Sequence, residues 1–305
     1  MEDVSARIEA ARHVSELRSL LQERHGFLKN TVDIAATNFG PTWIADLEDT
    51  LAKLFPSRDA LALAAKGYAL FVLHLLRAQR RFEEDGVYEP KSYAQASEDV
   101  YFDENYMMSE YLPALLLSHY LWPHHYRQLR FFDTTFLSQM QLHSALHFAE
   151  VGLGTGLYSR RALQAIASAR ASGFDISPAS ARFAEQHVGA FGLHDRFDVV
   201  LQDVTTHPIP ACDWLICVEV LEHLEDPVGF LRVLREALTP GGRAFITAAL
   251  NAPHVDHIYL YRNPEDVLDQ LEMAGFALEQ SFVAPAFSPP APGSPVPTVA
   301  AYVVV

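Results

Sequence analysis

The sequence of 305 residues is poor in cysteine, in cationic side chains and in long apolar runs. Its two cysteines, Cys212 and Cys217, flank one expected strand and are too few for the disulfide framework of a secreted domain. The N-terminus is acidic and amphipathic, which is unlike a secretory signal. We therefore expect a cytoplasmic protein that buries both cysteines in its core.

Cationic side chains are outnumbered, since 23 lysines and arginines face 38 acidic residues and the formal net charge is −15. A surface this acidic cannot neutralise phosphates, so we expect neither a nucleic acid nor an anionic membrane as a partner. The longest apolar stretch, residues 60–76, is interrupted by Lys66 and His74. This interruption favours a core helix over a membrane span.

Half of the residues are hydrophobic and 11% are aromatic, which is enough for the packed core of one large domain or two moderate ones. Early in the chain, apolar residues recur at helical spacing over residues 4–21, 41–55 and 57–84. From residue 146 onward, short apolar runs alternate with helical patterns, as in an α/β fold. We predict a helical domain over residues 1–140 and an α/β domain over residues 141–305.

The most informative segment is Phe-Ala-Glu-Val-Gly-Leu-Gly-Thr-Gly, residues 148–156. An apolar strand runs here into a turn that has glycine at alternate positions, Gly152, Gly154 and Gly156. Glycine tolerates positive φ and has no Cβ, so a ligand can lie directly against the main chain. The helical pattern of residues 157–169 would then point its free N–H groups at that ligand.

Acidic residues follow the next three expected strands. Asp175, Asp203 and Glu219 each come directly after an apolar run of strand length. The carboxyl ends of parallel strands form the edge at which open α/β sheets bind their ligands, and nucleotide-binding folds place a ribose-binding acid at about the position of Asp175. A helix start is the alternative reason for polar residues here, with Ser177 as the cap.

Together these motifs resemble the class I S-adenosylmethionine-dependent methyltransferases. Residues 150–156 are similar to the first motif of that family, an acid followed by Gly-x-Gly-x-Gly, and differ from the nicotinamide-binding pattern Gly-x-Gly-x-x-Gly. Residues 218–227 (Val-Glu-Val-Leu-Glu-His-Leu-Glu-Asp-Pro) and 238–246 resemble later motifs of the ubiquinone-biosynthesis-like branch. The resemblance covers residues 146–305 and implies a Rossmann-like sheet of seven strands with an antiparallel last strand. The helical domain would form a lid over its carboxyl edge.

The resemblance also implies a cofactor, S-adenosylmethionine, and the residues that hold it. The three glycines would approach its methionine part, Asp175 its ribose, and Asp203 with Val204 its adenine. Glu219 would lie near the amino acid end or the acceptor. The residues expected at the cofactor are Glu150, Gly152, Gly154, Gly156, Asp175, Ile176, Asp203, Val204 and Glu219.

Aromatic and histidine residues are dense between residues 101 and 136 and again at residues 251–261. Packing between helices and sheet is one reason for such a composition. Buried tyrosines and histidines need hydrogen-bond partners, however, so the density also favours a pocket. Its aromatic walls and few cations predict a small, partly apolar acceptor. The candidate acceptor residues are Tyr106, Tyr111, His119, His124 and Tyr261.

For proton removal from the acceptor, His257 is the preferred base, with Asp256 as its orienting partner or an alternative base and His254 as the second choice. A neutral imidazole titrates near physiological pH, which suits a general base. These residues could instead only position the acceptor, in which case alignment alone suffices. They could also bind a divalent ion with His124 or His125, although their spacing matches no specific zinc pattern.

Two further residues of the later motif are assigned no chemistry. Glu222 is interpreted as a solvated charge or a charge near a helix N-terminus. His223 is interpreted as a residue that caps or packs the turn. The expected catalytic set therefore contains neither of them, and no metal ligand.

Three functions remain open on the sequence. The first is transfer of a methyl group from S-adenosylmethionine to an O-, C- or N-nucleophile of a small acceptor, with a role in secondary metabolism. The second is a nicotinamide-dependent oxidoreductase on the same class of fold, which the glycine spacing disfavours. The third is a cofactor-binding scaffold without catalysis. Assembly into a homo-oligomer through the N-terminal helices is a further expectation.

Overall fold

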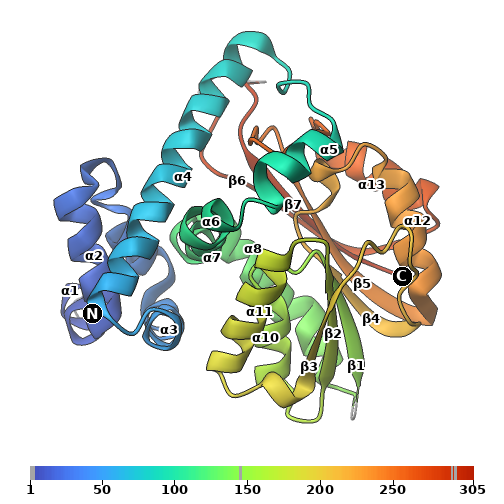
Figure 1. Cartoon of the computed structure of the whole chain (residues 1–305), viewed down its shortest axis with the longest axis horizontal. Coiled ribbons are helices and arrows are strands. Elements are labelled where there is room, and N and C mark those ends of the chain that lie inside the picture. The colour runs from blue at the N-terminus through green and yellow to red at the C-terminus, as the bar shows by residue number, and fades with distance from the viewer. Residues whose placement is uncertain (1–3, 144–145, 290, 292–293) are drawn as a thin grey trace.

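The computed structural model describes residues 4–143, 146–289, 291 and 294–305, and shows a helical region followed by a sheet flanked by helices (Figure 1). Every regular element within residues 4–143 is a helix, as predicted for the first part of the chain. The longer helices of this region are α1 (Val4–Ala10), α2 (Arg12–Arg24), α3 (Thr31–Leu54), α4 (Arg58–Asp85), α7 (Leu112–Leu121) and α8 (Pro123–Phe131).

The boundaries of these helices differ from the predicted ranges for local reasons. The pattern over residues 4–21 is broken at Ala11, whose extended backbone separates α1 from α2. The expected helix over residues 41–55 is the second half of α3, which begins ten residues earlier and kinks at Gly40, with a φ of +72°, just before Pro41. Ser57 caps α4 as expected, since its hydroxyl accepts a hydrogen bond from the Ala60 N–H at 3.2 Å.

Several short elements also lie between α4 and the sheet. They are α5 (Tyr93–Ala96), the π-helical turns η2 (Ser97–Tyr101), η3 (Met107–Tyr111) and η4 (Phe132–Leu137), α6 (Glu104–Tyr106) and α9 (Ser138–Met140). A π-helical turn inserts one residue into the helical ladder and commonly occurs near functional sites. The turns η2 and η3 end at Tyr101 and Tyr111, and both side chains reach the carboxyl edge of the sheet.

The second part of the chain forms one seven-stranded sheet in the order β3-β2-β1-β4-β5-β7-β6. Its strands are β1 (His147–Val151), β2 (Arg170–Asp175), β3 (Phe197–Leu201), β4 (Cys212–Cys217), β5 (Leu238–Leu250), β6 (Leu278–Pro285) and β7 (Thr298–Val304). The first five pair in parallel, and β7 pairs antiparallel with both β5 and β6. The predicted seven-stranded α/β fold with an antiparallel last strand and an N-terminal helical region is confirmed.

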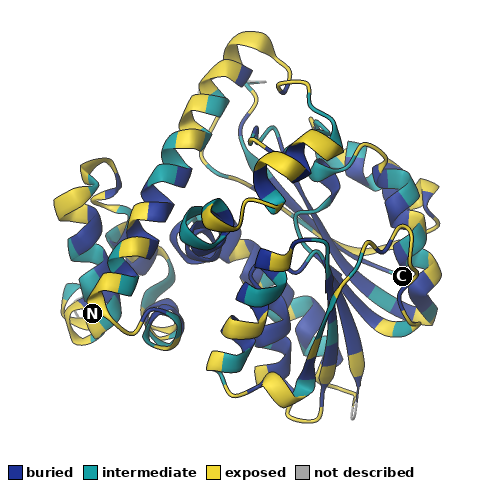
Figure 2. Ribbon diagram, in the orientation of Figure 1, coloured by how far each residue is buried: buried dark blue, intermediate teal, exposed yellow. Residues whose placement is uncertain are grey.

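Side chains alternate between the two faces of the sheet and contribute to two separate cores. Figure 2 shows much of the sheet in the colour of buried residues. On one face, Phe148, Ile216 and Phe245 pack in a core shared with α7, α8, α10 (Leu157–Ala165) and α11 (Pro178–Ala190). On the other face, Leu215 and Ile246 pack against α12 (Pro227–Ala237) and α13 (Pro264–Met273). The helical region therefore continues one core of the sheet.

Of the described helices, α4 alone is long and apolar enough to cross a membrane by the criteria of length and composition. The core helices of water-soluble proteins pass the same criteria. One face of α4 packs against α2, α7 and η3 and buries Leu61, Tyr68 and Phe71, whereas Leu63 and Leu76 are exposed. The absence of a membrane partner stays a prediction.

Candidate functional site

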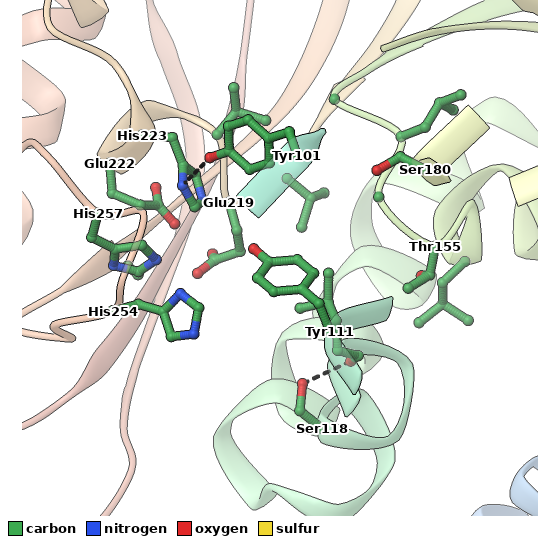
Figure 3. A pocket seen from close by; sticks show the side chains of 18 of the residues that line it. Tyr101, Tyr111, Ser118, Thr155, Ser180, Glu219, Glu222, His223, His254 and His257 are labelled. Carbon is green, nitrogen blue, oxygen red and sulfur yellow. Dashed lines mark hydrogen bonds between the residues drawn. The ribbon is translucent and has the colours of Figure 1, made fainter. Parts of the chain in front are cut away.

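A cavity of about 220 Å³ lies at the carboxyl edge of the sheet, between the strand ends and the helical region (Figure 3). Its floor is formed by the glycine-rich turn after β1 and by the turns that follow β2, β4 and β5. Its walls come from α4, η2, η3 and α7, which contribute Phe71, Tyr101, Tyr111 and His119. A ligand bound here would touch both parts of the chain.

The glycine-rich turn adopts the conformation that its sequence predicts. Gly152, Gly154 and Gly156 all have positive φ, at 74°, 48° and 67°. At Gly152 and Gly156 the lack of a Cβ also permits close packing, because a Cβ would lie 2.4 Å from Val220 Cγ2 and 2.9 Å from Ala184 Cβ. Gly154 lines the cavity together with Gly152, so these two glycines let a ligand approach the main chain.

Glu150, the acid before the glycines, is buried at the end of β1 and lines the cavity. One of its carboxylate oxygens accepts a hydrogen bond from the Ser159 N–H at the start of α10, at 2.9 Å. Burial raises the pKa of Glu150 to about 7, even though this hydrogen bond favours the ionised form. Glu150 thus ties the first turn of α10 to the strand below it.

Asp175 lies beside the glycine-rich turn at the end of β2, as predicted. Its carboxylate accepts hydrogen bonds from the Gly154 N–H at 3.2 Å and the Ser177 N–H at 2.8 Å. Ser177 in turn caps α11 by accepting a hydrogen bond from Ser180, so the capping and binding interpretations are compatible. Burial raises the pKa of Asp175 to about 6, while these backbone hydrogen bonds act in the opposite direction. Ile176 also lines the cavity.

Gly156, Asp203 and Val204 do not line the cavity, unlike the other residues expected at the cofactor. Asp203 is exposed, and its carboxylate accepts hydrogen bonds from the Thr205 N–H at 2.9 Å and the Thr205 hydroxyl at 2.6 Å. Val204 is buried in the core below α12. In this structure Asp203 and Val204 shape the turn after β3.

Glu219 lies just past β4 in a conformation that is rare for residues other than glycine, with a φ of +52°. Two hydrogen bonds with Thr247 on β5 hold Glu219 in this conformation. The Glu219 N–H donates to the Thr247 hydroxyl at 2.9 Å, and this hydroxyl donates to a Glu219 carboxylate oxygen at 2.6 Å. The carboxylate lines the cavity, where Figure 3 shows it pointing toward Tyr111 and the histidines. Thr247 therefore positions Glu219, a role that the sequence did not reveal.

The interpretation of Glu222 as a solvated charge was wrong. Its side chain is fully buried in the short turn η6 (Leu221–His223), and both carboxylate oxygens lack a hydrogen-bond partner within the described part of the chain. Burial raises the pKa of Glu222 well above its usual value, and the nearby Glu219 carboxylate raises it further. The sequence did contain a signal, because Glu219 and Glu222 are three residues apart and His223 follows.

Asp256 is the centre of a buried hydrogen-bonded cluster. It accepts a hydrogen bond from the Tyr111 phenol at 2.9 Å and pairs with Nδ1 of His254, while Nδ1 of His223 lies 3.4 Å from it. Burial raises the pKa of Asp256, but the adjacent His254 and His223 more than offset this effect and hold it well below its usual range. An ionised Asp256 thus orients His254, whose buried Nε2 has no partner within the described residues.

His257 is not paired with Asp256, contrary to the prediction. Its Nδ1 donates to the Ala252 carbonyl oxygen at 2.6 Å, and the ring lies edge-on to the His223 ring with centroids 4.7 Å apart. Burial lowers the pKa of His257 well below its usual value, with a further contribution from His223. The histidine that the aspartate orients is therefore His254, the second choice on the sequence.

His223 makes polar contacts in addition to packing in the turn after β4. Its Nδ1 lies 2.8 Å from the Tyr101 hydroxyl and 3.1 Å from the Asp256 carbonyl oxygen, and its ring lines the cavity. Tyr101 comes from η2, so this contact joins the helical region to the turn after β4. Burial lowers the pKa of His223, and the nearby Asp256 carboxylate acts in the opposite direction.

The five residues predicted to contact the acceptor differ in whether they line the cavity. Tyr111 and His119 line the cavity. Tyr106, His124 and Tyr261 do not line it in this conformation, and their contact with the acceptor stays a prediction. His124 stacks on Trp122 with the rings 8° from parallel, and Tyr261 donates a hydrogen bond to Gln270 at 2.6 Å in the opposite core. Their positions follow from packing between elements that sequence spacing does not specify.

Two groups of side chains near the cavity could hold a metal ion. They are Glu222, His223 and His257, and His254, Asp256 and His257. In each group the ligand atoms all lie within 4.8 Å of one another. The expected additional ligands His124 and His125 belong to neither group, because α8 places them beside Trp122.

Comparisons with known proteins agree with this geometry. Residues 149–244 match the family model described as a methyltransferase domain. The ubiquinone biosynthesis O-methyltransferase of Xanthomonas axonopodis pv. citri is 29% identical over 105 residues, which are 34% of this chain and 43% of that protein. The enzyme of the same name from Parvibaculum lavamentivorans is 34% identical over 129 residues, 41% of this chain and 49% of that protein. The chain thus spans less than half the length of these relatives.

A solved structure resembles a larger share of the chain. The mitomycin 7-O-methyltransferase MmcR aligns with 85% of this chain and 75% of its own, with a TM-score of 0.50 and 18% sequence identity. At this identity the likeness concerns the fold alone. It includes the helical region as well as the sheet, because the alignment extends beyond the residues that the family model matches.

Proposed function

Since the chain carries a class I S-adenosylmethionine-dependent methyltransferase domain, we propose that it transfers the methyl group of S-adenosylmethionine to a hydroxyl oxygen of a small, partly aromatic acceptor. The observation that carries this proposal is a buried Asp256–His254 pair that faces the same cavity as the glycine-rich turn. The named relatives, which are O-methyltransferases, support the choice of oxygen.

The residues on the floor of the cavity are suited to bind the cofactor. Gly152 and Gly154 offer uncovered main chain, and the Asp175 carboxylate has lone pairs left to accept hydrogen bonds from a ribose diol. Bound S-adenosylmethionine supplies an electrophilic methyl group on a cationic sulfur. What the chain must add is alignment of the acceptor oxygen with that methyl group, and removal of the hydroxyl proton.

We assign proton removal to His254. Asp256 accepts the Nδ1–H of this ring, which fixes the tautomer and leaves the Nε2 lone pair directed away from the aspartate. The acceptor oxygen forms a bond to the methyl carbon, the carbon–sulfur bond breaks with its electron pair going to sulfur, and the hydroxyl proton passes to Nε2. His257 lacks an aspartate partner and is therefore less suited to this role.

The acceptor faces aromatic walls. Phe71, Tyr111 and Trp122 line the cavity opposite the strand ends, and Leu115 adds aliphatic surface. Such walls favour a flat, partly apolar molecule, while the phenols and imidazoles can accept or donate hydrogen bonds to its polar groups. A role in secondary metabolism, a cytoplasmic location and a division into functional domains at residue 140 are further parts of this proposal.

The direct test is incubation of the purified chain with methyl-labelled S-adenosylmethionine and a panel of small phenols and hydroxylated heterocycles. We expect S-adenosylhomocysteine and a methyl ether in equal amounts, identified by mass spectrometry. Binding of S-adenosylhomocysteine is measured separately by calorimetry, with NAD as the control ligand. Binding of NAD alone would contradict the cofactor, and labelling of only RNA or protein in an extract would contradict the small acceptor.

A further inference from the structure

Glu222 is the side chain that the mechanism above leaves unexplained. It is fully buried, and both of its carboxylate oxygens lack a hydrogen-bond partner within the described part of the chain. An isolated buried carboxylate is costly and normally pairs with a cation or takes up a proton. A second acid, Glu219, lines the same cavity and makes this stretch of its wall still more acidic.

The groups nearest to Glu222 are imidazoles. A carboxylate oxygen of Glu222 and one ring nitrogen each of His223 and His257 lie within 4.8 Å of one another. Nitrogen and oxygen ligands lie about 2.0–2.2 Å from a zinc ion, so neighbouring ligand atoms are about 3–4 Å apart. Small side-chain rotations would therefore bring all three atoms to a common ion.

Both imidazoles are already oriented as metal ligands usually are. His257 donates its Nδ1–H to the Ala252 carbonyl oxygen, and Nδ1 of His223 lies within hydrogen-bonding distance of the Asp256 carbonyl oxygen and the Tyr101 hydroxyl. Such contacts from the second ring nitrogen fix the orientation of metal-binding histidines. Since Nδ1 of each ring faces these oxygen atoms, Nε2 is the ring nitrogen that would bind an ion.

We propose that Glu222, His223 and His257 bind a divalent cation of the first transition row. Two imidazoles and one carboxylate suit Zn²⁺, Fe²⁺ or Mn²⁺ better than Mg²⁺, which prefers oxygen ligands. The overlapping group of His254, Asp256 and His257 is a poorer site, because Asp256 already accepts a hydrogen bond from Tyr111 and pairs with His254. Glu222 has neither kind of partner within the described residues.

Three protein ligands leave positions on the ion open toward the cavity, which His223, His257 and Glu222 all line. A hydroxyl or phenol of the acceptor bound there would lose its proton more readily, since a divalent ion stabilises the resulting oxyanion. This assignment rests on the proposed function only for its role in catalysis. The binding of the ion itself is independent of the cofactor and the acceptor.

The test measures Mn²⁺ binding by electron paramagnetic resonance on protein treated with EDTA and then desalted, without cofactor or acceptor. We expect one Mn²⁺ per wild-type chain, displaced by Zn²⁺ but only weakly by Mg²⁺. Glu222→Gln and His257→Ala should each weaken Mn²⁺ binding by at least ~10-fold, which is ~1.4 kcal/mol. The matched control is His254→Ala, which removes a neighbouring imidazole of the same cluster and should bind Mn²⁺ like the wild type.

Calorimetry with S-adenosylhomocysteine shows whether each variant is folded. No Mn²⁺ binding to the wild type would overturn the metal site, even if methyl transfer takes place. A loss of binding in His254→Ala as large as in His257→Ala, or none in Glu222→Gln, would overturn this set of ligands. Metal binding without any methyl transfer would leave the site intact and count against the proposed function alone.

Discussion

The sheet and the helical region contribute to the cavity in different ways. In the sheet, each acid of the floor lies near the carboxyl end of a strand, so Glu150, Asp175 and Glu219 reach the cavity from positions that the order of the strands fixes. In the helical region, the residues of the walls come from α4, η2, η3 and α7, whose sequences resemble ordinary core. The floor is thus encoded locally, whereas the walls depend on how helices pack. The residues proposed to bind the cofactor therefore depend on the order of the strands, whereas those proposed to contact the acceptor depend on the packing of the helices.

Among the floor residues, a substitution of Gly154 should weaken cofactor binding most. A valine here must adopt a φ of +48°, which is strained for a β-branched residue, and its side chain would enter the cavity. We expect Gly154→Val to weaken S-adenosylhomocysteine binding by at least ~100-fold, or ~2.8 kcal/mol, measured by calorimetry. Gly189→Val, at a helical position with no heavy atom within 4 Å of an added Cβ, is the control and should bind normally. Normal binding by Gly154→Val would mean that the cofactor lies elsewhere.

Removal of the His254 side chain tests the proposed general base. His254→Ala should lower turnover roughly 10²- to 10⁴-fold, the usual contribution of a general base. Its affinity for S-adenosylhomocysteine should stay within about twofold of the wild type, because the cofactor's contacts are on the glycine-rich turn and Asp175. His147→Ala, on the exposed amino end of β1, should retain full turnover. A loss of less than tenfold in His254→Ala would favour catalysis by alignment alone.

The helical region should lose stability in acid through its buried histidines. Burial lowers the pKa of His119 to about 4 and that of His124 to about 3, so the folded chain keeps both rings neutral. The unfolded chain binds protons below about pH 6.5, so stability is complete above that pH and falls as the pH drops toward 4.

At pH 5 the loss should be about 2 kcal/mol for each of these two histidines. Urea unfolding at pH 7.5 and pH 5.0 measures it, and His124→Gln should reduce the dependence on pH by about 2 kcal/mol, the contribution of that one ring. A free energy of unfolding that is equal at the two pH values would show that these rings are not buried as neutral groups.

A substitution of Asp175 should weaken cofactor binding less than a substitution of Gly154. Asp175→Ala should weaken S-adenosylmethionine binding by roughly 1.5–3 kcal/mol, the scale of lost hydrogen bonds to a charged group. Because burial raises the pKa of Asp175 to about 6, wild-type affinity should also fall as the pH drops below that value, where a protonated acid accepts fewer hydrogen bonds. Calorimetry between pH 5 and 8 measures both effects. Asp175→Ala should lack the dependence on pH, and a variant that retains it would assign the titration to another group.

Most of the fold could be read from the pattern of the sequence. The helical first part and the alternation of strands and helices were predicted from apolar runs and helical spacing, which are local properties, whereas the seven-stranded sheet was implied by the family resemblance. The π-helical turns η2 and η3 were not predicted, since an inserted helical residue changes the apolar spacing very little. The broken first helix and the early start of α3 were missed for the same reason that helix ends are hard to locate from spacing alone.

The sequence by itself determined the glycine-rich turn and the acids near the carboxyl ends of β1, β2 and β4, because a turn and a strand end depend on neighbouring residues only. Only the tertiary structure decided that Asp256 orients His254 instead of His257, and that Glu222 is buried beside His223. These choices rest on side chains far apart in the chain, such as Tyr111 and Asp256, which meet when the helical region packs on the sheet. Hydrogen-bond partners and burial of that kind are set by packing, and no local spacing encodes them.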